Sequence, residues 1–199
     1  LRRTQAALSW ASLAYLWLGR WNKAEEAGRE ALRLAQEYSD DGLISIGARQ
    51  LCFVYTAKGD LDRAIEYGEM SVEKAPTPGD KTHSQLAQTW AMCRAGELER
   101  NIERLAELVQ LLRDGQVVSI LIAYMPVLAE AYILAGQHDK AKQTAEEALE
   151  LAERHGARYF LGWASRLLGE ITLEITAEEA APHFQKAITI SREIKAENE

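Results

Sequence analysis

The residues that could carry chemistry in this chain are four histidines, two cysteines and several adjacent glutamate pairs. His83 and Cys93 lie about three turns apart on one predicted helix, too far for a nucleophile and its base. Neighbouring helical positions point about 100° apart, so each glutamate pair, such as Glu146–Glu147, reads as a solvated face and not a catalytic dyad. No GxxxxGK, HExxH or CxxC motif occurs. The sequence therefore predicts no enzyme activity, no cofactor and no metal site.

Charge and composition narrow the class of partner. The formal net charge is −7 and the pI is about 5.3, whereas nucleic-acid binding needs a basic surface. The longest uncharged stretch, 115–129, is shorter than the roughly 18–20 apolar residues of a membrane helix. Two cysteines do not make a disulfide framework. These features predict a cytoplasmic protein with no nucleic-acid or membrane partner.

A small–aromatic–Gly–small pattern recurs along the chain. Its turn glycines follow at intervals of 40, 37 and 40 residues, at Gly19, Gly59, Gly96 and Gly136. The best-kept copy has Ala129, Tyr132, Gly136, Ala141, Ala145 and Ala148. Glycine suits the end of a helix because a left-handed conformation costs it little. The pattern predicts stacked helix–turn–helix repeats.

Helical periodicity predicts ten helices in five antiparallel pairs. Their predicted ranges are 4–18, 21–37, 42–58, 61–75, 80–95, 98–113, 117–135, 138–155, 158–174 and 177–196. The third pair is a weak copy, with Met92 and Asn101 at register positions. In the fifth, Thr176 stands at the turn and fits a capping box with Glu179.

Two prolines leave the helix limits open. Pro126 is expected to kink its helix or mark its start, and Pro182 implies a kink or a start later than Thr176. Repeats are expected at about 4–40, 41–78, 79–115, 116–156 and 157–196, together forming one domain over 1–199. Both ends look like cuts within a longer protein.

The repeat pattern resembles the tetratricopeptide repeat (TPR). The resemblance implies an all-α solenoid of about five TPR-like repeats wound into a right-handed superhelix. The segments MPVLAEAYILAGQHDKAKQTAEEAL and RLLGEITLEIT are similar to parts of the C-terminal arrays of bacterial signalling proteins. Two groups share this resemblance: class III adenylate/guanylate cyclases with an ATPase module, and ATPase-linked activators of the maltose-regulon type. Any catalytic part of such a parent would lie outside this chain.

In repeats of this type the first helix of each pair lines a concave groove. By register, the groove is predicted to include Trp10, Trp17, Arg49, Gln50, Phe53, Trp90, Arg94, Glu130, Trp163 and Arg166. Trp and Arg dominate binding hot spots, which favours a peptide or helix ligand. The competing interpretation is that tryptophans on apolar helix faces belong to the core.

Three functions fit the sequence. The leading prediction is a non-catalytic module that binds a peptide, a protein or other domains of the same polypeptide. The alternatives are a sensor of a sugar or metabolite, whose ring would stack on the groove aromatics, and a scaffold for self-association.

Overall fold

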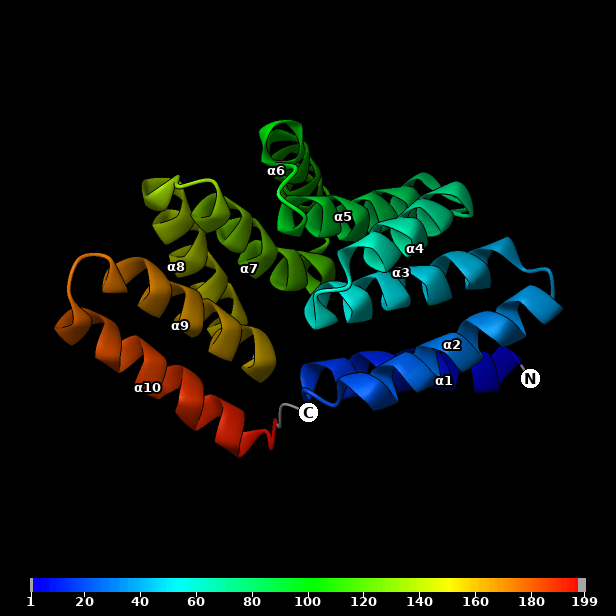
Figure 1. The fold of residues 1–199 in the computed structure, drawn as a ribbon, viewed down its shortest axis with the longest axis horizontal. Helices are drawn as coiled ribbons and strands as arrows, with labels where there is room; N and C mark the ends of the chain where they lie inside the picture. Colours follow the sequence, from blue (N-terminus) through cyan, green and yellow to red (C-terminus); the bar gives the residue numbers. More distant parts are fainter. Residues whose placement is uncertain (1, 197–199) are drawn as a thin grey trace. The chain divides into compact units, whose positions relative to one another are not determined.

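The computed structural model describes residues 2–196, and these residues form ten α-helices joined by short turns (Figure 1). The helices are α1 (Arg2–Trp17), α2 (Trp21–Glu37), α3 (Asp41–Lys58), α4 (Leu61–Glu73), α5 (Pro78–Arg94), α6 (Leu98–Asp114), α7 (Val118–Leu134), α8 (His138–Arg154), α9 (Arg158–Leu173) and α10 (Ala177–Glu193). This confirms the predicted all-α class, and every helix lies within a few residues of its predicted range.

The turns follow the predicted glycine chemistry. Gly19, Gly59, Gly96 and Gly136 all have left-handed φ angles between 68° and 91°. Here a side chain would meet the steric penalty that glycine avoids. Gly156, which the sequence pattern did not single out, ends α8 in the same way, with φ 64°.

Polar side chains begin several of the helices. The carboxylate of Asp40 accepts the backbone N–H of Leu43 at 3.1 Å, at the start of α3. Thr176 accepts the N–H of Glu179 at 3.1 Å, as expected for half of the predicted capping box. Each bond satisfies one of the backbone donors that a helix start leaves without a partner.

Both prolines lie inside helices. Pro126 belongs to the middle of α7 and does not mark its start. Pro182 lies inside α10, which begins at Ala177, the first residue of the predicted range. Helix α5 begins at Pro78, earlier than predicted, because proline at the first helical position removes only a donor that needs no partner.

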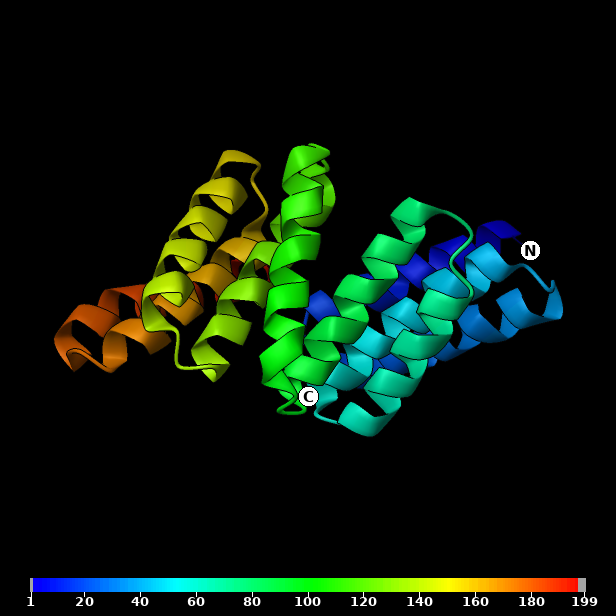
Figure 2. The ribbon, with the colours of Figure 1, turned by 90° about the horizontal axis from the view of Figure 1, so that it is seen from above.

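The chain divides into two compact units. The first ends at Ala95 and the second spans Gly96–Ala196, so the division lies in the turn of the third predicted pair. In the first unit each helix packs on its neighbours in sequence, and the first helices of successive pairs, α1, α3 and α5, also contact each other (Figure 2). Its core includes Leu51, Cys52, Tyr55, Ala64, Ala87 and Ala91.

The second unit repeats this layering. Helices α6 to α10 pack in sequence order, and α7 contacts α9 directly. Its core joins Ala129, Ala141 and Ala145 to Leu167, Leu168 and Ile171 of α9. Small residues on α7 and α8 let α9 approach closely, so the first helices of the fourth and fifth pairs, α7 and α9, lie in contact.

Candidate functional site

The second unit gathers aromatic and charged side chains where α7 and α9 meet. Trp163, Arg166 and Glu170 follow helical spacing on α9 and therefore share one side of it. Arg166 Nη2 lies 3.7 Å from the carboxylate of Glu130 on α7, and Arg166 also forms an ion pair with Glu170. We call Glu130, Tyr159, Trp163, Arg166 and Glu170 the α7–α9 face.

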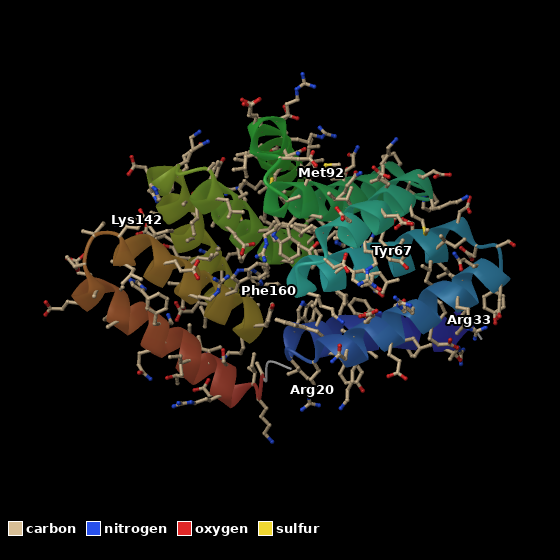
Figure 3. The ribbon with its side chains drawn as sticks, viewed as in Figure 1. Arg20, Arg33, Tyr67, Met92, Lys142 and Phe160 are labelled. Atoms are coloured by element: carbon tan, nitrogen blue, oxygen red, sulfur yellow. The ribbon has the colours of Figure 1, made fainter. Side chains whose placement is uncertain are left out.

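Tyr159 extends this face with a second aromatic ring. Its ring centroid lies 6.1 Å from that of Trp163 and 5.2 Å from that of Phe160, which Figure 3 labels. Burial raises the pKa of Tyr159 to about 12; the positive charge of Arg166 opposes this shift and that of Glu130 adds to it. The phenol is therefore protonated at neutral pH.

Two of the three charged side chains of the α7–α9 face stay accessible. The side chains of Arg166 and Glu170 are 41% and 38% exposed to solvent, whereas that of Glu130 is 11% exposed. A guanidinium with its own carboxylates on either side can exchange one of them for a carboxylate or carbonyl of a partner. The neighbouring rings offer apolar contact area, so the surface combines the two residue types that dominate protein-binding hot spots.

A hollow of about 390 Å³ lies between α9 and α10 beside this face. Its lining comprises Arg166, Glu170, Phe184, Ala187, Ile188, Ser191, Arg192 and Ala196. Arg166 and Glu170 thus belong both to the α7–α9 face and to the edge of the hollow. A partner on that face would find an open recess next to it.

The predicted residues of α3 and α5 also come together, but they are largely buried. The rings of Phe53 and Trp90 have centroids 5.8 Å apart, and Arg49 and Trp90 are 9% and 6% exposed. Gln50 is 5% exposed, and its Oε1 makes no hydrogen bond within residues 2–196. Arg94, at the end of α5, is exposed.

His83 joins this α3–α5 cluster. Burial lowers the pKa of His83 to about 3, and the positive charge of Arg49 contributes to the decrease. The imidazole is therefore neutral at physiological pH. A neutral half-buried histidine beside a buried arginine fits the structural role that the sequence favoured over a catalytic one.

The predicted tryptophans of α1 have different surroundings. Trp17 is half-buried and packs against the cluster of Leu16, Ala24 and Val54. Trp10 is 69% exposed. Counted back from the turn glycines Gly19 and Gly59, Trp10 occupies the same repeat position as Gln50 of α3. Gln50 is buried, so this position packs against neighbouring helices in another repeat.

The groove prediction omitted one member of the α7–α9 face. Tyr159 lies four residues before Trp163 on the same helix, a spacing that places both on one side. Helical spacing alone could therefore have found it. The groove was predicted from the small and aromatic positions near the turn that recur between repeats. Tyr159 lies at the opposite end of its helix.

The histidines and acidic pairs form no catalytic arrangement in the described part of the chain. His138 Nδ1 lies 3.1 Å from a carboxylate oxygen of Glu174, and His155 caps the end of α8. Within residues 2–196, no three His, Cys, Asp or Glu side chains are placed to hold a metal ion. The described helices also include none with the length and apolarity needed to cross a bilayer.

Comparison with known proteins agrees with this architecture. Residues 119–193 match the family model described as tetratricopeptide repeat. Crystal structures of nearly identical TPR-like repeats, from a Podosopora anserina protein proposed to be a kinesin light chain, are similar to 96% of this chain. The two reach TM-scores of 0.59 and 0.57 at 16% identity, over 96% and 97% of their own chains.

A structure of MamA from AMB-1 covers 94% of this chain and 98% of its own, with a TM-score of 0.45 and 19% identity. None of the curated proteins compared with the chain matches it. The α7–α9 face falls inside the matched segment. The described chain has the all-α fold of a TPR-like repeat array, and the match to the tetratricopeptide repeat model lies in its second unit.

Proposed function

We propose that this protein is a non-catalytic interaction module that binds a peptide or protein partner through the α7–α9 face. The observation that carries the proposal is the accessible guanidinium of Arg166, held between Glu130 and Glu170 beside the rings of Trp163 and Tyr159. TPR-like arrays generally serve as scaffolds for such contacts.

Exposure favours this face over the α3–α5 cluster. Arg49 and Trp90 are less than 10% exposed to solvent, so a ligand could reach them only after the helices around them rearrange. The side chains of Arg166 and Glu170 are more than one third exposed to solvent. A partner can therefore contact the α7–α9 face without a change in the packing of the first helices.

A peptide library selected on the immobilised chain tests the proposal. The selected peptides are then titrated against the wild type and against Arg166→Glu, which reverses the charge of the partly exposed guanidinium. We expect binding to weaken about tenfold or more, since a charge-assisted contact is replaced by repulsion. Arg154→Glu makes the same change at an exposed site on α8 and should leave the affinity unaltered.

Equal affinity for the wild type and both variants would contradict the proposed surface. A second variant, Arg166→Gln, separates charge from packing, because glutamine keeps part of the side-chain stem and a donor group. We expect it to weaken binding in the same direction. Circular dichroism of each variant shows whether the helices remain intact.

A second candidate function, self-association, has its own observation. Large apolar side chains are exposed on α1 and on the last helix pair, with Trp10, Leu173 and Ile188 at 69%, 53% and 45%. The repeat register aligns Trp10 with Leu167, which is fully buried against the preceding pair. Exposed apolar surface of this kind marks contact sites between proteins.

Light scattering over a concentration series tests self-association. If Trp10 mediates it, the mass rises with concentration for the wild type and stays at the monomer value for Trp10→Glu. A wild-type monomer at every concentration would exclude this function for residues 1–199.

The resemblance to bacterial repeat arrays supports a regulatory role for the module. We propose that it belongs to a cytoplasmic signalling protein, such as a nucleotide cyclase or a maltose-regulon-type activator, and that its five repeats act as one domain over 1–199. The isolated chain should then turn over no nucleotide. Cyclase or ATPase activity above background, unchanged by repurification, would contradict a non-catalytic module.

A further inference from the structure

A tyrosine and a cation recur at matching positions in the two units. The turn glycines Gly59 and Gly136 align helices α2, α3 and α4 with α6, α7 and α8. In the first set, the guanidinium of Arg63 lies 4.3 Å from the ring centroid of Tyr55. In the second, Lys140 Nζ lies 5.5 Å from the ring centroid of Tyr132. The two sites are therefore copies of one arrangement, and they can be compared residue by residue.

In the first unit the space around the tyrosine hydroxyl is filled by the chain itself. Arg29 donates to Tyr55 Oη from Nε at 3.1 Å and from Nη2 at 2.8 Å. Tyr55 Oη in turn donates to Glu25 at 2.8 Å, and Lys58 Nζ donates to the same carboxylate at 2.5 Å. The ring of Tyr67, labelled in Figure 3, stacks on Tyr55 with centroids 5.4 Å apart. The side chains of Arg29, Glu25 and Tyr67 therefore occupy the space around Tyr55.

In the second unit the filling side chains are replaced by apolar ones. The positions of Glu25, Arg29 and Lys58 are taken by Ile102, Ala106 and Ala135. A hollow of about 400 Å³ results, lined by Leu98, Glu99, Ile102, Glu103, Ala106, Tyr132, Ala135, Gln137 and Lys140. We call it the α6–α8 pocket.

The polar groups of the α6–α8 pocket have few partners of their own. The hydroxyl of Tyr132 makes no hydrogen bond to any described residue. Gln137 stands where Asp60 holds Arg63 in the first unit, so Lys140 lacks the matching carboxylate. Glu99 and Glu103, one turn apart on α6, are exposed and form no ion pair with the described part of the chain. The two carboxylates at the rim and the hydroxyl of Tyr132 can therefore all accept hydrogen bonds from a ligand, and the two carboxylates outnumber the single cation, Lys140.

The first unit indicates which group completes the site. There, a guanidinium donates to the tyrosine hydroxyl and pairs with a carboxylate one turn earlier on its own helix, as Arg29 does with Glu25 at 3.1 Å. The α6–α8 pocket keeps the hydroxyl and presents two carboxylates at its rim, but Ala106 supplies no guanidinium. We propose that the α6–α8 pocket binds an arginine side chain of a basic peptide partner, which takes the place that Arg29 occupies in the first unit.

The fit follows from both halves of the arginine side chain. Its methylene stem can lie on Ile102 and Ala106, while the planar guanidinium donates to Tyr132 Oη and to Glu99 or Glu103. The net charge of −7 attracts a basic peptide to the chain as a whole. The pocket is separate from the α7–α9 face, so this inference goes beyond the proposed function and can fail without affecting it.

The test uses the full chain and a small probe, Nα-acetyl-L-arginine amide, followed by ¹⁵N–¹H NMR. We expect saturable shifts at the amides of Ile102, Ala106 and Ala135, at millimolar concentrations typical of a single side chain. Nα-acetyl-L-citrulline amide has the same shape without the charge, and it should bind at least about tenfold more weakly. Nα-acetyl-L-lysine amide keeps the charge but lacks the planar fork, and it should also bind more weakly.

Two variants link the shifts to the pocket. Ile102→Glu with Ala106→Arg rebuilds the network of the first unit inside the pocket, so the arginine probe should no longer bind although the fold is kept. Tyr132→Phe removes only the hydroxyl and should weaken binding severalfold. Glu146→Gln neutralises an exposed carboxylate of α8 outside the pocket and serves as the matched control.

Each result of these binding experiments either supports or overturns the proposed arginine site. Equal binding of the arginine and citrulline probes would overturn the proposal, and so would equal binding of arginine and lysine, because either result removes the guanidinium as the recognised group. Undiminished arginine binding by the Ile102→Glu/Ala106→Arg variant would also overturn it, as would the absence of saturable shifts at the three amides. Selective arginine binding that the double variant abolishes would support it.

Discussion

At the residue scale, His83 shows how burial decides the role of a chemically versatile side chain. Its imidazole lies in the α3–α5 cluster near Arg49, and its pKa falls to about 3. The sequence already favoured a structural histidine here. It gave no sign of the depressed pKa, because that shift arises from packing between helices that are distant along the chain.

The depressed pKa makes stability depend on pH. Below about 6.5 the unfolded chain takes up a proton on His83, whereas the folded chain does not until pH 3. Stability should therefore decrease as the pH falls from 7 toward 3, by about 1–2 kcal/mol from this group at pH 5. Urea unfolding at pH 7 and pH 5 measures the decrease.

His83→Gln is the control, since glutamine does not titrate. The variant should lose less stability than the wild type between the two pH values. An identical loss in both proteins would show that other groups account for the acid sensitivity.

Gly68 carries a second prediction at the residue scale. An added Cβ would lie 2.9 Å from Cβ and 3.1 Å from Cα of Gln88, so α4 and α5 would have to move apart. We expect Gly68→Ala to lower the free energy of unfolding by about 1–3 kcal/mol.

Gly79 provides the matched substitution, because its nearest neighbour is Thr77 Oγ1 at 3.9 Å. Gly79→Ala should be neutral or slightly stabilising, since alanine favours the helix. Thermal unfolding of the two variants side by side checks both expectations; similar melting temperatures would mean that α4 and α5 are not so closely packed.

At the element scale, the sequence predicted all ten helices because amphipathic periodicity and turn glycines agree along the chain. The differences lie where proline is involved. The stretch around Pro76 and Pro78 was interpreted as a loop up to residue 80, yet Thr77 caps a helix that begins at Pro78. Pro126 and Pro182 lie within helices, a placement that tertiary packing permits and local rules do not predict.

Ala145 tests the register that links these helices. It is fully buried in the cluster that joins α8 to Leu167 and Leu168 of α9. Ala145→Trp should overpack this contact and cost about 1–3 kcal/mol or more.

Lys142, on the same helix and labelled in Figure 3, is exposed. Lys142→Trp should therefore leave the melting temperature nearly unchanged. If both variants melted alike, the register of α8 against α9 would be incorrect.

At the scale of the whole molecule, composition and repeat spacing were enough to predict an all-α array. They were not enough to predict its division into two compact units at Gly96. The weak third copy, with Met92 and Asn101 in place of register residues, marked the region where the division lies. The repeat pattern could not show which polar residues of the first helices remain accessible, because tertiary packing buries the arginine at Arg49 and leaves the one at Arg166 exposed.

The α6–α8 pocket illustrates the same limit. Sequence register places Tyr55 and Tyr132 at equivalent packing positions. What distinguishes them is the filling of the surrounding space by Arg29 and Glu25 in one unit and its absence in the other. That difference becomes visible when the contacts of the two units are compared.

Peptide binding at the accessible face formed by α7 and α9 can be measured through amide hydrogen exchange of the chain, with and without a library-selected peptide. We expect slower exchange in α7 and α9, no change in α2 and α4, and no protection in the Arg166→Glu variant at the same peptide concentration. Protection confined to α2 and α4, or equal protection in the variant, would rule out binding at this face.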